Sequence, residues 1–213
     1  MPDTLPPPLS RDSRVSADAA RASLTRERWV ESALALLVDS GIDSVRVDVV
    51  AKRLGVTRGS FYWHFKDRDD LLEHMLLQWR KAATEQIIER FDTRHSEPRE
   101  LLKELLSLPF RGRSAERAAR LELAIREWAR RDPMARQALD DVDSRRITYI
   151  ARCFVALGFD VDEARSRAFI LYGYEVAESL LRTQGTPAQK AERSALIETL
   201  LLARVSDLAS RNG

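Results

Sequence analysis

Apolar residues recur at three- and four-residue steps along most of the chain, and no segment shows the alternation of a half-buried strand. The pattern therefore predicts an all-α fold of about nine helices. The first helix is expected to begin after Thr25, which can act as its N-cap, and to end at Ser40 and Gly41. Its inner face is predicted to hold Val30, Ala33, Leu34, Leu37 and Val38.

Two short helices are predicted in residues 47–65, separated by Gly55. The first carries one apolar stripe, formed by Val47, Val50, Ala51 and Leu54. Gly55 stands where helices commonly end in a left-handed residue, and Thr57 can cap the second helix. A turn of only a few residues between two helices is what a helix-turn-helix requires.

In the second helix, Phe61 and Phe65 lie four residues apart and are expected to pack inward. Aromatic residues at helical spacing are more often core than contact surface. Tyr62 and Trp63, however, cannot both join the two phenylalanines on so short a helix, so an exposed role is favoured for them. His64 has two interpretations, a structural histidine or a contact to phosphate.

Positive charge is concentrated on the same segment. Residues 46–66 hold five basic residues against one acidic residue, a net charge of +4, whereas the whole chain carries +2. Binding to phosphate needs a local positive face rather than a basic protein. Charge and exposed aromatic side chains together indicate a surface for a DNA groove.

Residues 55–65, GVTRGSFYWHF, followed by Asp67, Arg68 and Leu71, resemble the DNA-binding domain of the TetR family of one-component transcriptional regulators. The resemblance covers residues 25 to about 79, and the rest of the chain is similar only in length and in being helical. It implies a sequence-specific DNA-binding regulator, a repressor that a small hydrophobic effector releases from its operator. The alternative is a TetR-like helical adaptor or corepressor that acts through protein partners.

The resemblance also implies roles for single residues. Arg58, Gly59, Tyr62 and Trp63 would enter the major groove, with Arg58 placed for a bidentate contact to guanine. Arg46 stands where the family usually has a capping Ser or Thr, so that cap is missing or moved to Ser44. The predicted DNA-binding residues are Arg46, Thr57, Arg58, Gly59, Ser60, Tyr62, Trp63, His64 and Arg68.

Three segments are predicted: an arm without regular structure (1–22), a three-helix helix-turn-helix DNA-binding domain (23–70), and a helical effector-binding and dimerisation domain (71–213). Arg11, Arg14 and Arg21 of the arm can reach a minor groove or belong to a solvated tail. Asp67 can cap a long helix that runs to about Phe91. Later helices are expected at about residues 99–107, 114–131, 133–157, 161–182 and 187–210.

The last two predicted helices carry more apolar surface than one core needs. Residues 164–181 are apolar on most sides, which predicts burial all round. The last helix has two apolar rows, Leu196, Leu200 and Ala203 on one, and Ile197, Leu201, Val205 and Leu208 on the other. The resemblance implies a homodimer through these helices that binds pseudo-palindromic double-stranded DNA. A large monomeric core is the alternative.

An effector pocket is expected among the middle helices. Its candidate residues are Phe110, Trp128, Tyr149, Phe154, Phe169, Tyr172 and Glu175. They suggest a partly aromatic, hydrophobic small molecule. Glu175 and Glu178 interrupt an apolar helix and can anchor a cationic or hydroxylated ligand, lie at a dimer interface, or reach solvent.

Composition narrows the function classes. The single cysteine, Cys153, excludes a disulfide framework and favours a reducing, cytoplasmic compartment. No apolar run approaches the ~20 residues that span a bilayer, so no membrane association is expected. The three histidines lack the spacing of metal ligands, and no H-E-x-x-H, G-x-S-x-G or P-loop pattern occurs. We therefore predict no enzymatic activity, no cofactor and no metal site.

Overall fold

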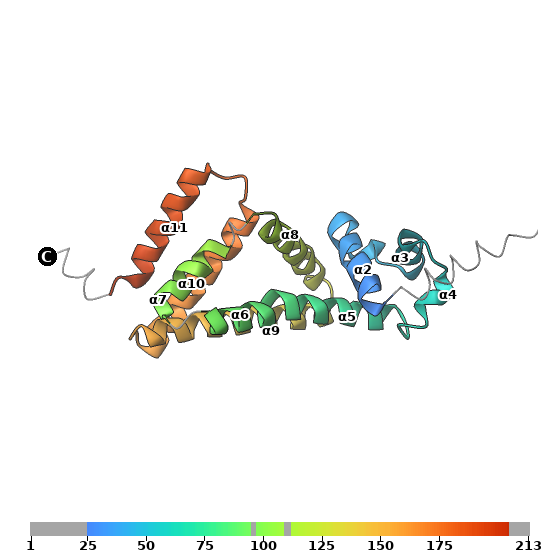
Figure 1. Cartoon of the computed structure of the whole chain (residues 1–213), viewed down its shortest axis with the longest axis horizontal. Coiled ribbons are helices and arrows are strands. Elements are labelled where there is room, and N and C mark those ends of the chain that lie inside the picture. Colours follow the sequence, from blue (N-terminus) through green and yellow to red (C-terminus); the bar gives the residue numbers. More distant parts are fainter. Residues whose placement is uncertain (1–24, 95–96, 109–111, 205–213) are drawn as a thin grey trace, which may run out of the picture. The chain divides into compact units, whose positions relative to one another are not determined.

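The computed structural model describes residues 25–94, 97–108 and 112–204 (Figure 1). Within these ranges all regular elements are helical, which confirms the all-α prediction. The arginines of the predicted N-terminal arm, together with Phe110, Val205 and Leu208, lie outside the described residues. The chain divides into two compact units, unit 1 ending at Gln78 and unit 2 beginning at Trp79.

Unit 1 is built from short helices that follow one another closely. They are α2 (Arg26–Ser40), the 3-10 helix η1 (Ile42–Ser44), α3 (Val47–Leu54), α4 (Arg58–Phe61) and the first part of α5 (Arg68–Arg80). The second helix of the motif is thus shorter than predicted, because residues 62–64 form a turn after α4.

An aromatic cluster forms the core of unit 1. Phe61 and Phe65 are buried as predicted, with their ring centroids 5.2 Å apart. Trp29 of α2, which the sequence pattern did not place inside, is fully buried and meets Phe61 edge to face at 5.4 Å. Val38, expected on the inner face of α2, is only half-buried. Most of the predicted apolar stripe on α2 and α3 is therefore confirmed, and Trp29 is an addition to it.

The helix ends in unit 1 match the sequence only in part. Gly55 ends α3 in the left-handed conformation with φ 70°, and the Asp67 carboxylate accepts the backbone N–H of Asp70 at the start of α5, both as predicted. Thr25 and Thr57 occupy N-cap positions, but neither side chain accepts a capping hydrogen bond. Those two capping predictions are wrong.

Unit 2 continues the chain from the end of α5. Its elements are the π-helix η2 (Lys81–Glu85), α6 (Gln86–Arg94), α7 (Pro98–Ser107), α8 (Gly112–Ala129), α9 (Pro133–Ala156), α10 (Val161–Leu180) and α11 (Pro187–Leu202). The predicted unbroken helix up to about Phe91 is therefore interrupted by a π-helical segment. Within the unit, α9 packs against α7, α8 and α10, and α11 contacts α7 and α10 (Figure 1).

Side-chain caps begin three of these helices where the sequence predicted them. Asp132 accepts from the N–H of Ala135, and Pro133 follows as the first residue of α9. Asp160 caps α10 through the N–H of Asp162. Thr186 forms a capping box with Gln189 at the start of α11. The capping residues and prolines in the sequence thus predicted the starts of α9, α10 and α11 correctly.

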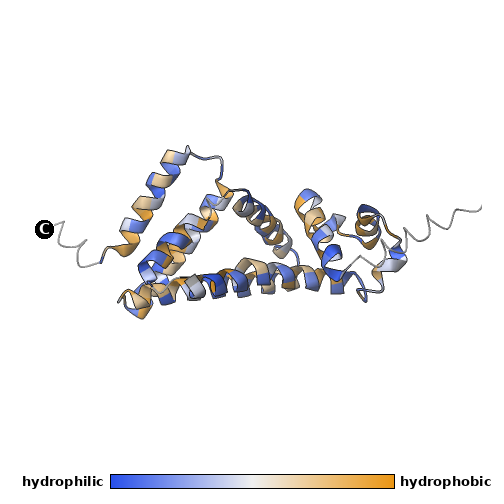
Figure 2. Cartoon of the chain, in the orientation of Figure 1, coloured by the Kyte–Doolittle hydropathy of each residue, from blue (hydrophilic) through white to orange (hydrophobic). Residues whose placement is uncertain are grey.

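The core of unit 2 lies among α6, α7, α9, α10 and α11, each of which carries both apolar and polar residues (Figure 2). The prediction that α10 is buried all round is wrong for this chain taken alone, because one of its faces is exposed. The exposed apolar residues on α10 and α11 include Phe169, Ile170, Leu180, Leu196 and Leu200, whereas Leu201 is buried. Of the described residues in the two apolar rows predicted on α11, Leu196 and Leu200 of one row are exposed, and Leu201 of the other is buried.

Candidate functional site

The loop and turn around α4 form the first candidate site. Phe61 and Phe65 fix the segment from inside, and between them Tyr62 is 53% and Trp63 is 89% exposed. A tryptophan with so little contact to its own protein is an unusual surface residue, because large aromatic side chains are normally buried. The structure therefore presents two aromatic side chains outward on a rigid support.

The polar groups of this segment hydrogen-bond to one another. Nη2 of Arg58 donates to the Tyr62 hydroxyl at 3.3 Å, and the hydroxyls of Thr57 and Ser60 lie 3.2 Å apart. None of these residues is buried. The His64 side chain is half-buried, with its ring centroid 6.4 Å from that of Trp29. The predicted DNA-binding residues from Thr57 to His64 thus lie on one continuous segment, and their contacts to DNA stay a prediction.

Gly59 has no structural reason within the protein to be glycine. The backbone of Gly59 is not in the left-handed region, because Gly59 is not among the described glycines that have a positive φ. A Cβ at this position would meet only Thr57 Oγ1, at 3.8 Å, which is ordinary van der Waals contact. Because Gly59 has no Cβ, another molecule can approach the backbone of α4 closely at this position.

Two arginines hold the segment in place. The Arg68 guanidinium donates to the carbonyl oxygens of Val45 at 2.7 Å and Ile42 at 3.2 Å, which ties the start of α5 to the chain entering α3. Arg26 donates to the carbonyl oxygen of His64 at 2.6 Å and lies over the Phe65 ring. The DNA contact predicted for Arg68 stays a prediction, whereas its hydrogen bonds to the chain before α3 are seen in the structure. Sequence reasoning missed Arg26, whose partners lie far away in the chain.

Neither Arg46 nor Ser44 caps α3 through its side chain. Arg46 occupies the N-cap position but its side chain makes no capping hydrogen bond, and its guanidinium pairs with Asp48 at 3.0 Å. The Ser44 hydroxyl donates to the carbonyl oxygen of Gly41 instead, so of the two alternatives the cap is missing. The hydrogen bond from Arg46 lowers the pKa of Asp48. The pair is exposed, and we expect it to open readily for another anion.

A cavity of about 350 Å³ in unit 2 is the second candidate site. It lies among η2, α6, α7, α8, α9 and α10, and most of its wall is apolar. Of the seven predicted effector residues, Tyr149 and Glu175 line it. Trp128, Phe154 and Tyr172 are buried in the helical core, Phe169 is 66% exposed, and none of the four lines this cavity.

A charged network stands at one side of the cavity. Glu122 of α8 accepts from Arg126 at 2.9 Å and from Arg146 of α9 at 2.9 Å. Arg126 also pairs with Asp143 at 2.8 Å, and the Tyr172 hydroxyl donates to that same carboxylate at 2.5 Å. Burial alone would raise the pKa of Glu122, but Arg146 and Arg126 hold it below its ordinary value. Two guanidinium groups thus balance two carboxylates.

Glu175 and Thr84 differ from this network, because each has a buried side-chain oxygen atom with no partner among the described residues. Glu175 Oε1 and Thr84 Oγ1 are both buried, and both residues line the cavity. Burial raises the pKa of Glu175 to about 8, Arg146 opposing the change and Glu122 adding to it. The sequence pointed to Glu175 as an interruption of an apolar helix, but nothing in it pointed to Thr84.

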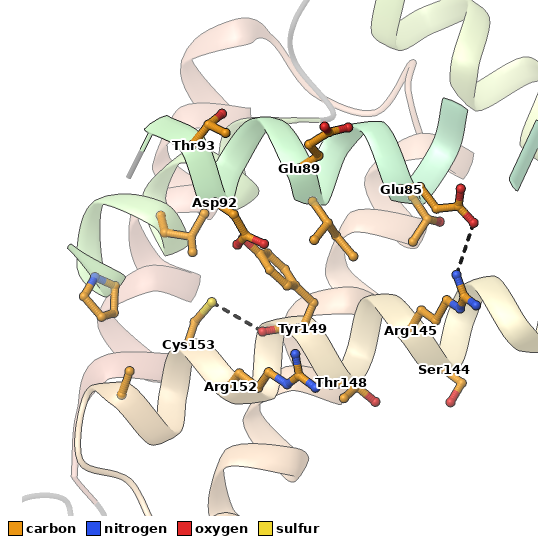
Figure 3. Close-up of a pocket in the computed structure, with 15 residues that line it drawn as sticks. Glu85, Glu89, Asp92, Thr93, Ser144, Arg145, Thr148, Tyr149, Arg152 and Cys153 are labelled. Atoms are coloured by element: carbon orange, nitrogen blue, oxygen red, sulfur yellow. Dashed lines mark hydrogen bonds and ion pairs between the residues drawn. The ribbon is translucent and has the colours of Figure 1, made fainter. Parts of the chain in front are cut away.

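A second, larger hollow of about 810 Å³ is lined by η2, α6, α7 and α9, and Glu85 and Asp92 reach toward α9 in it (Figure 3). Glu89 of α6 also lines this hollow. The Tyr149 hydroxyl donates to Asp92 at 2.8 Å, and Glu85 accepts from Arg145 at 3.2 Å. This acidic groove is partly neutralised by contacts from α9. It adjoins the first cavity, because Thr84, Ile88 and Tyr149 line both.

Two kinds of site are absent from the described part of the chain. In these residues no group of His, Cys, Asp and Glu side chains is arranged to hold a metal ion. No described helix is both long enough and apolar enough to cross a membrane.

Sequence comparison shows which known proteins the region around α3 and α4 is similar to. A family described as "Bacterial regulatory proteins, tetR family" matches residues 30–75. The chain is 40% identical over 58 residues to the HTH-type transcriptional regulator SrpR of Pseudomonas putida, and 43% identical over 54 residues to AcrR of Shigella flexneri. These matches cover 27% and 25% of this chain, and the same shares of the two relatives. The chain thus matches about a quarter of the length of these curated relatives.

Structural comparison extends the similarity to both units. The crystal structure of a putative TetR-family transcriptional regulator from Rhodococcus sp. matches 84% of this chain and 98% of its own, with a TM-score of 0.66 and 20% sequence identity. At that identity the match shows a shared fold. Residues 30–75 are thus similar in sequence to the tetR family of bacterial regulatory proteins, and the chain as a whole shares the fold of that structure.

Proposed function

We propose that this protein is a transcriptional regulator that binds a pseudo-palindromic operator as a homodimer, acts as a repressor, and is released by a small hydrophobic effector. The observation that carries the DNA-binding part is the segment after Thr57, where Tyr62 and Trp63 are exposed between the buried Phe61 and Phe65. Outward aromatic side chains on a fixed turn beside basic residues suit a DNA groove and its phosphates.

Gly59 supports the same conclusion. Since neither backbone conformation nor internal packing requires glycine there, a close external surface is the remaining physical reason for it. The edges of base pairs in the major groove are such a surface. Arg58, one residue earlier, then lies where a guanidinium can reach guanine.

Phosphate contacts are assigned to the groups around this segment. The hydroxyls of Thr57 and Ser60 already point toward each other and can share one phosphate oxygen. Lys52 and Lys66 are exposed, and neither side chain has a carboxylate partner in the described residues. Counterion release by these groups would make binding strongly dependent on salt.

The exposed apolar faces of α10 and α11 support a homodimer. Phe169 and Ile170 on α10 and Leu196 and Leu200 on α11 are each about half exposed or more. A patch of several large apolar side chains on a monomer commonly marks a protein interface. A second copy that presents the same two helices would cover it, and it would supply the second recognition segment that a palindrome needs.

Release by an effector is assigned to the cavity of unit 2. A ligand shifts the operator equilibrium only if it binds the DNA-free and DNA-bound states with different affinity. η2 forms part of the cavity wall and directly follows α5, which begins in unit 1. Such π-helical segments often occur at functional sites, where they can change register.

The test is fluorescence anisotropy of the full chain with its own upstream duplex, with a scrambled duplex as reference, over a range of salt. We expect specific binding that weakens steeply with salt and is lost in Arg58→Ala and in Tyr62→Ala. Arg130→Ala, which removes an exposed arginine of unit 2, is the matched control and should bind normally. If both recognition variants keep full affinity, the proposed interface is wrong and the adaptor alternative gains support.

A further inference from the structure

The cavity in unit 2 has a mostly apolar wall with few polar groups. Its larger apolar residues are Ile87, Ile88, Phe91, Leu105, Leu108 and Ile150. Its volume of about 350 Å³ is at the small end for a ligand site. The space suits a compact molecule, such as one ring with a short chain.

The other charged groups on α8 and α9 that line the cavity, Arg146 and Glu122, are already paired. Arg146 donates through Nη1 to Glu122 at 2.9 Å and to the Tyr172 hydroxyl at 3.1 Å, and through Nη2 to the carbonyl oxygen of Ala83 at 3.1 Å. Glu122 is held from both sides by Arg146 and Arg126. A ligand anion would have to break one of these pairs.

The remaining lining elements add little charge toward Glu175. On α6, Arg90 is exposed, and its guanidinium stacks over the Phe91 ring at 5.8 Å. On α9, the Tyr149 hydroxyl is committed to Asp92 in the neighbouring groove. The lining residues from η2 and α7 are uncharged. Glu175 is therefore the ionisable group of the cavity that lacks a partner among the described residues.

Two buried side-chain oxygen atoms in the cavity wall are thus unpartnered among the described residues. Glu175 Oε1 on α10 and Thr84 Oγ1 on η2 are unpartnered in the described structure, and both residues line the cavity. Buried polar groups are nearly always hydrogen-bonded, so each such exception requires an explanation. A bound molecule with two N–H groups at one end and an apolar body at the other would satisfy both atoms.

We infer that this cavity binds a hydrophobic ammonium cation, whose N–H groups donate to Glu175 and Thr84 while its apolar body packs against α6, α7 and α8. The inference rests on the proposed function in one respect, namely that this ligand is the effector. Salt-bridge formation between the ammonium group and Glu175 supplies the specificity, and the apolar wall supplies the remaining affinity.

The pKa of Glu175 gives the inference a second consequence. With its pKa raised to about 8, the free carboxyl group is mostly protonated at neutral pH. An ammonium ligand favours the carboxylate, so Glu175 releases its proton to the buffer on binding while the ligand keeps all of its own. An alkylamine has a pKa near that of lysine, about 10.4, and stays charged. Affinity should therefore fall about tenfold per pH unit as the pH decreases below about 8.

The experiment compares three probes that share one body: 4-phenylbutylamine, 4-phenylbutan-1-ol and 4-phenylbutanoate. Each is titrated into the full chain by calorimetry, from about pH 8 down to about pH 6. We expect the amine to bind roughly tenfold more tightly than the alcohol at the upper pH, the butanoate to bind most weakly, and only the amine to lose affinity as the pH falls. Tighter binding of the alcohol or butanoate, or an amine affinity independent of pH, would overturn the inference.

Glu175→Gln keeps the size of the side chain and removes its charge. We expect this variant to lose the preference for the amine while it still binds the alcohol. Glu89→Gln, in the acidic groove of Figure 3, is the matched control and should bind as the natural chain does. If Glu89→Gln loses amine binding instead, the amine occupies the groove and the cavity assignment is wrong. Should Glu175→Gln fail to fold, the probe and pH series on the natural chain still decide.

None of these titrations contains DNA, so the two proposals can fail separately. Amine binding without operator binding would retain the site and reject the proposed regulator. Operator binding without amine binding would retain the regulator and reject the site.

Discussion

Replacing Gly59 by alanine separates the folding of the DNA-binding unit from its function. Gly59 lies in the middle of α4 with φ outside the left-handed region, and an added Cβ meets only Thr57 Oγ1 at 3.8 Å. Glycine is less favourable than alanine in a helix by up to about 1 kcal/mol, partly because it gives the unfolded chain more freedom. We therefore expect Gly59→Ala to raise the free energy of unfolding by about 0.4–1 kcal/mol.

Operator binding should change in the opposite direction. If the backbone of α4 approaches base edges at Gly59, the added methyl group has to push the helix outward and weaken the contacts of Arg58 and Tyr62. We expect the affinity for the operator to fall at least about tenfold, which corresponds to about 1.4 kcal/mol. Binding to unrelated DNA should change much less, since it depends on phosphate contacts.

Urea unfolding followed by circular dichroism measures the first quantity, and fluorescence anisotropy with operator and scrambled duplexes measures the second. A loss of stability would refute the packing described around Gly59. Unchanged operator affinity in a fully folded variant would show that the backbone of α4 does not approach DNA at Gly59. It would also remove the main argument that this face of α4 is turned toward the DNA.

Three further substitutions test the remaining parts of the account. Trp63→Ala should leave the free energy of unfolding within about 0.5 kcal/mol of the natural value, because the side chain is 89% exposed, yet it should weaken operator binding in the same anisotropy assay. Arg68→Ala should lower the free energy of unfolding by about 1–3 kcal/mol in urea titrations, because two backbone carbonyl oxygens before α3 lose a charged donor; an unchanged midpoint would contradict the bracing role. Phe169→Glu should convert the proposed dimer to a 24.3-kDa monomer in light scattering, whereas Val155→Glu, an exposed position on α9, should not; a Phe169→Glu protein that remains dimeric would place the interface elsewhere.

The parts of the fold that local chemistry determines were predictable from the sequence. Gly55 ends α3 because glycine adopts the left-handed conformation easily, and Asp132 with Pro133 begins α9 for equally local reasons. The inward positions of Phe61 and Phe65 followed from helical spacing. Each of these depends on residues within one or two turns of the chain.

Features that depend on distant partners were not predictable. The carbonyl oxygens that Arg68 holds lie more than twenty residues earlier in the chain, and no periodic pattern encodes that contact. The π-helical turn of η2 leaves no clear signal in composition. Thr84 attracts notice only because the fold buries its hydroxyl in the wall of the cavity that Glu175 also lines, without a partner among the described residues.

The DNA-binding motif and the ligand cavity were therefore predictable to different degrees. The motif is one continuous segment, so its family resemblance could be recognised from the residue pattern alone, and the family model matches residues 30–75. The cavity is lined by six helical elements, so its residues come together only in the folded chain. Of the expected aromatic residues that the structure describes, Tyr149 alone lines it, because helical spacing cannot distinguish a wall residue from a core residue.

Sequence-specific binding to a two-fold operator is the central claim, and selection from a pool of random duplexes tests it most directly. The full chain is incubated with the pool, and bound duplexes are recovered and sequenced over several rounds. The account predicts an inverted repeat whose half-sites lie about one helical turn apart or a multiple of it, and no enrichment with Arg58→Ala. Recovery of no common sequence by a folded natural chain, or of the same sequence by Arg58→Ala, would contradict it.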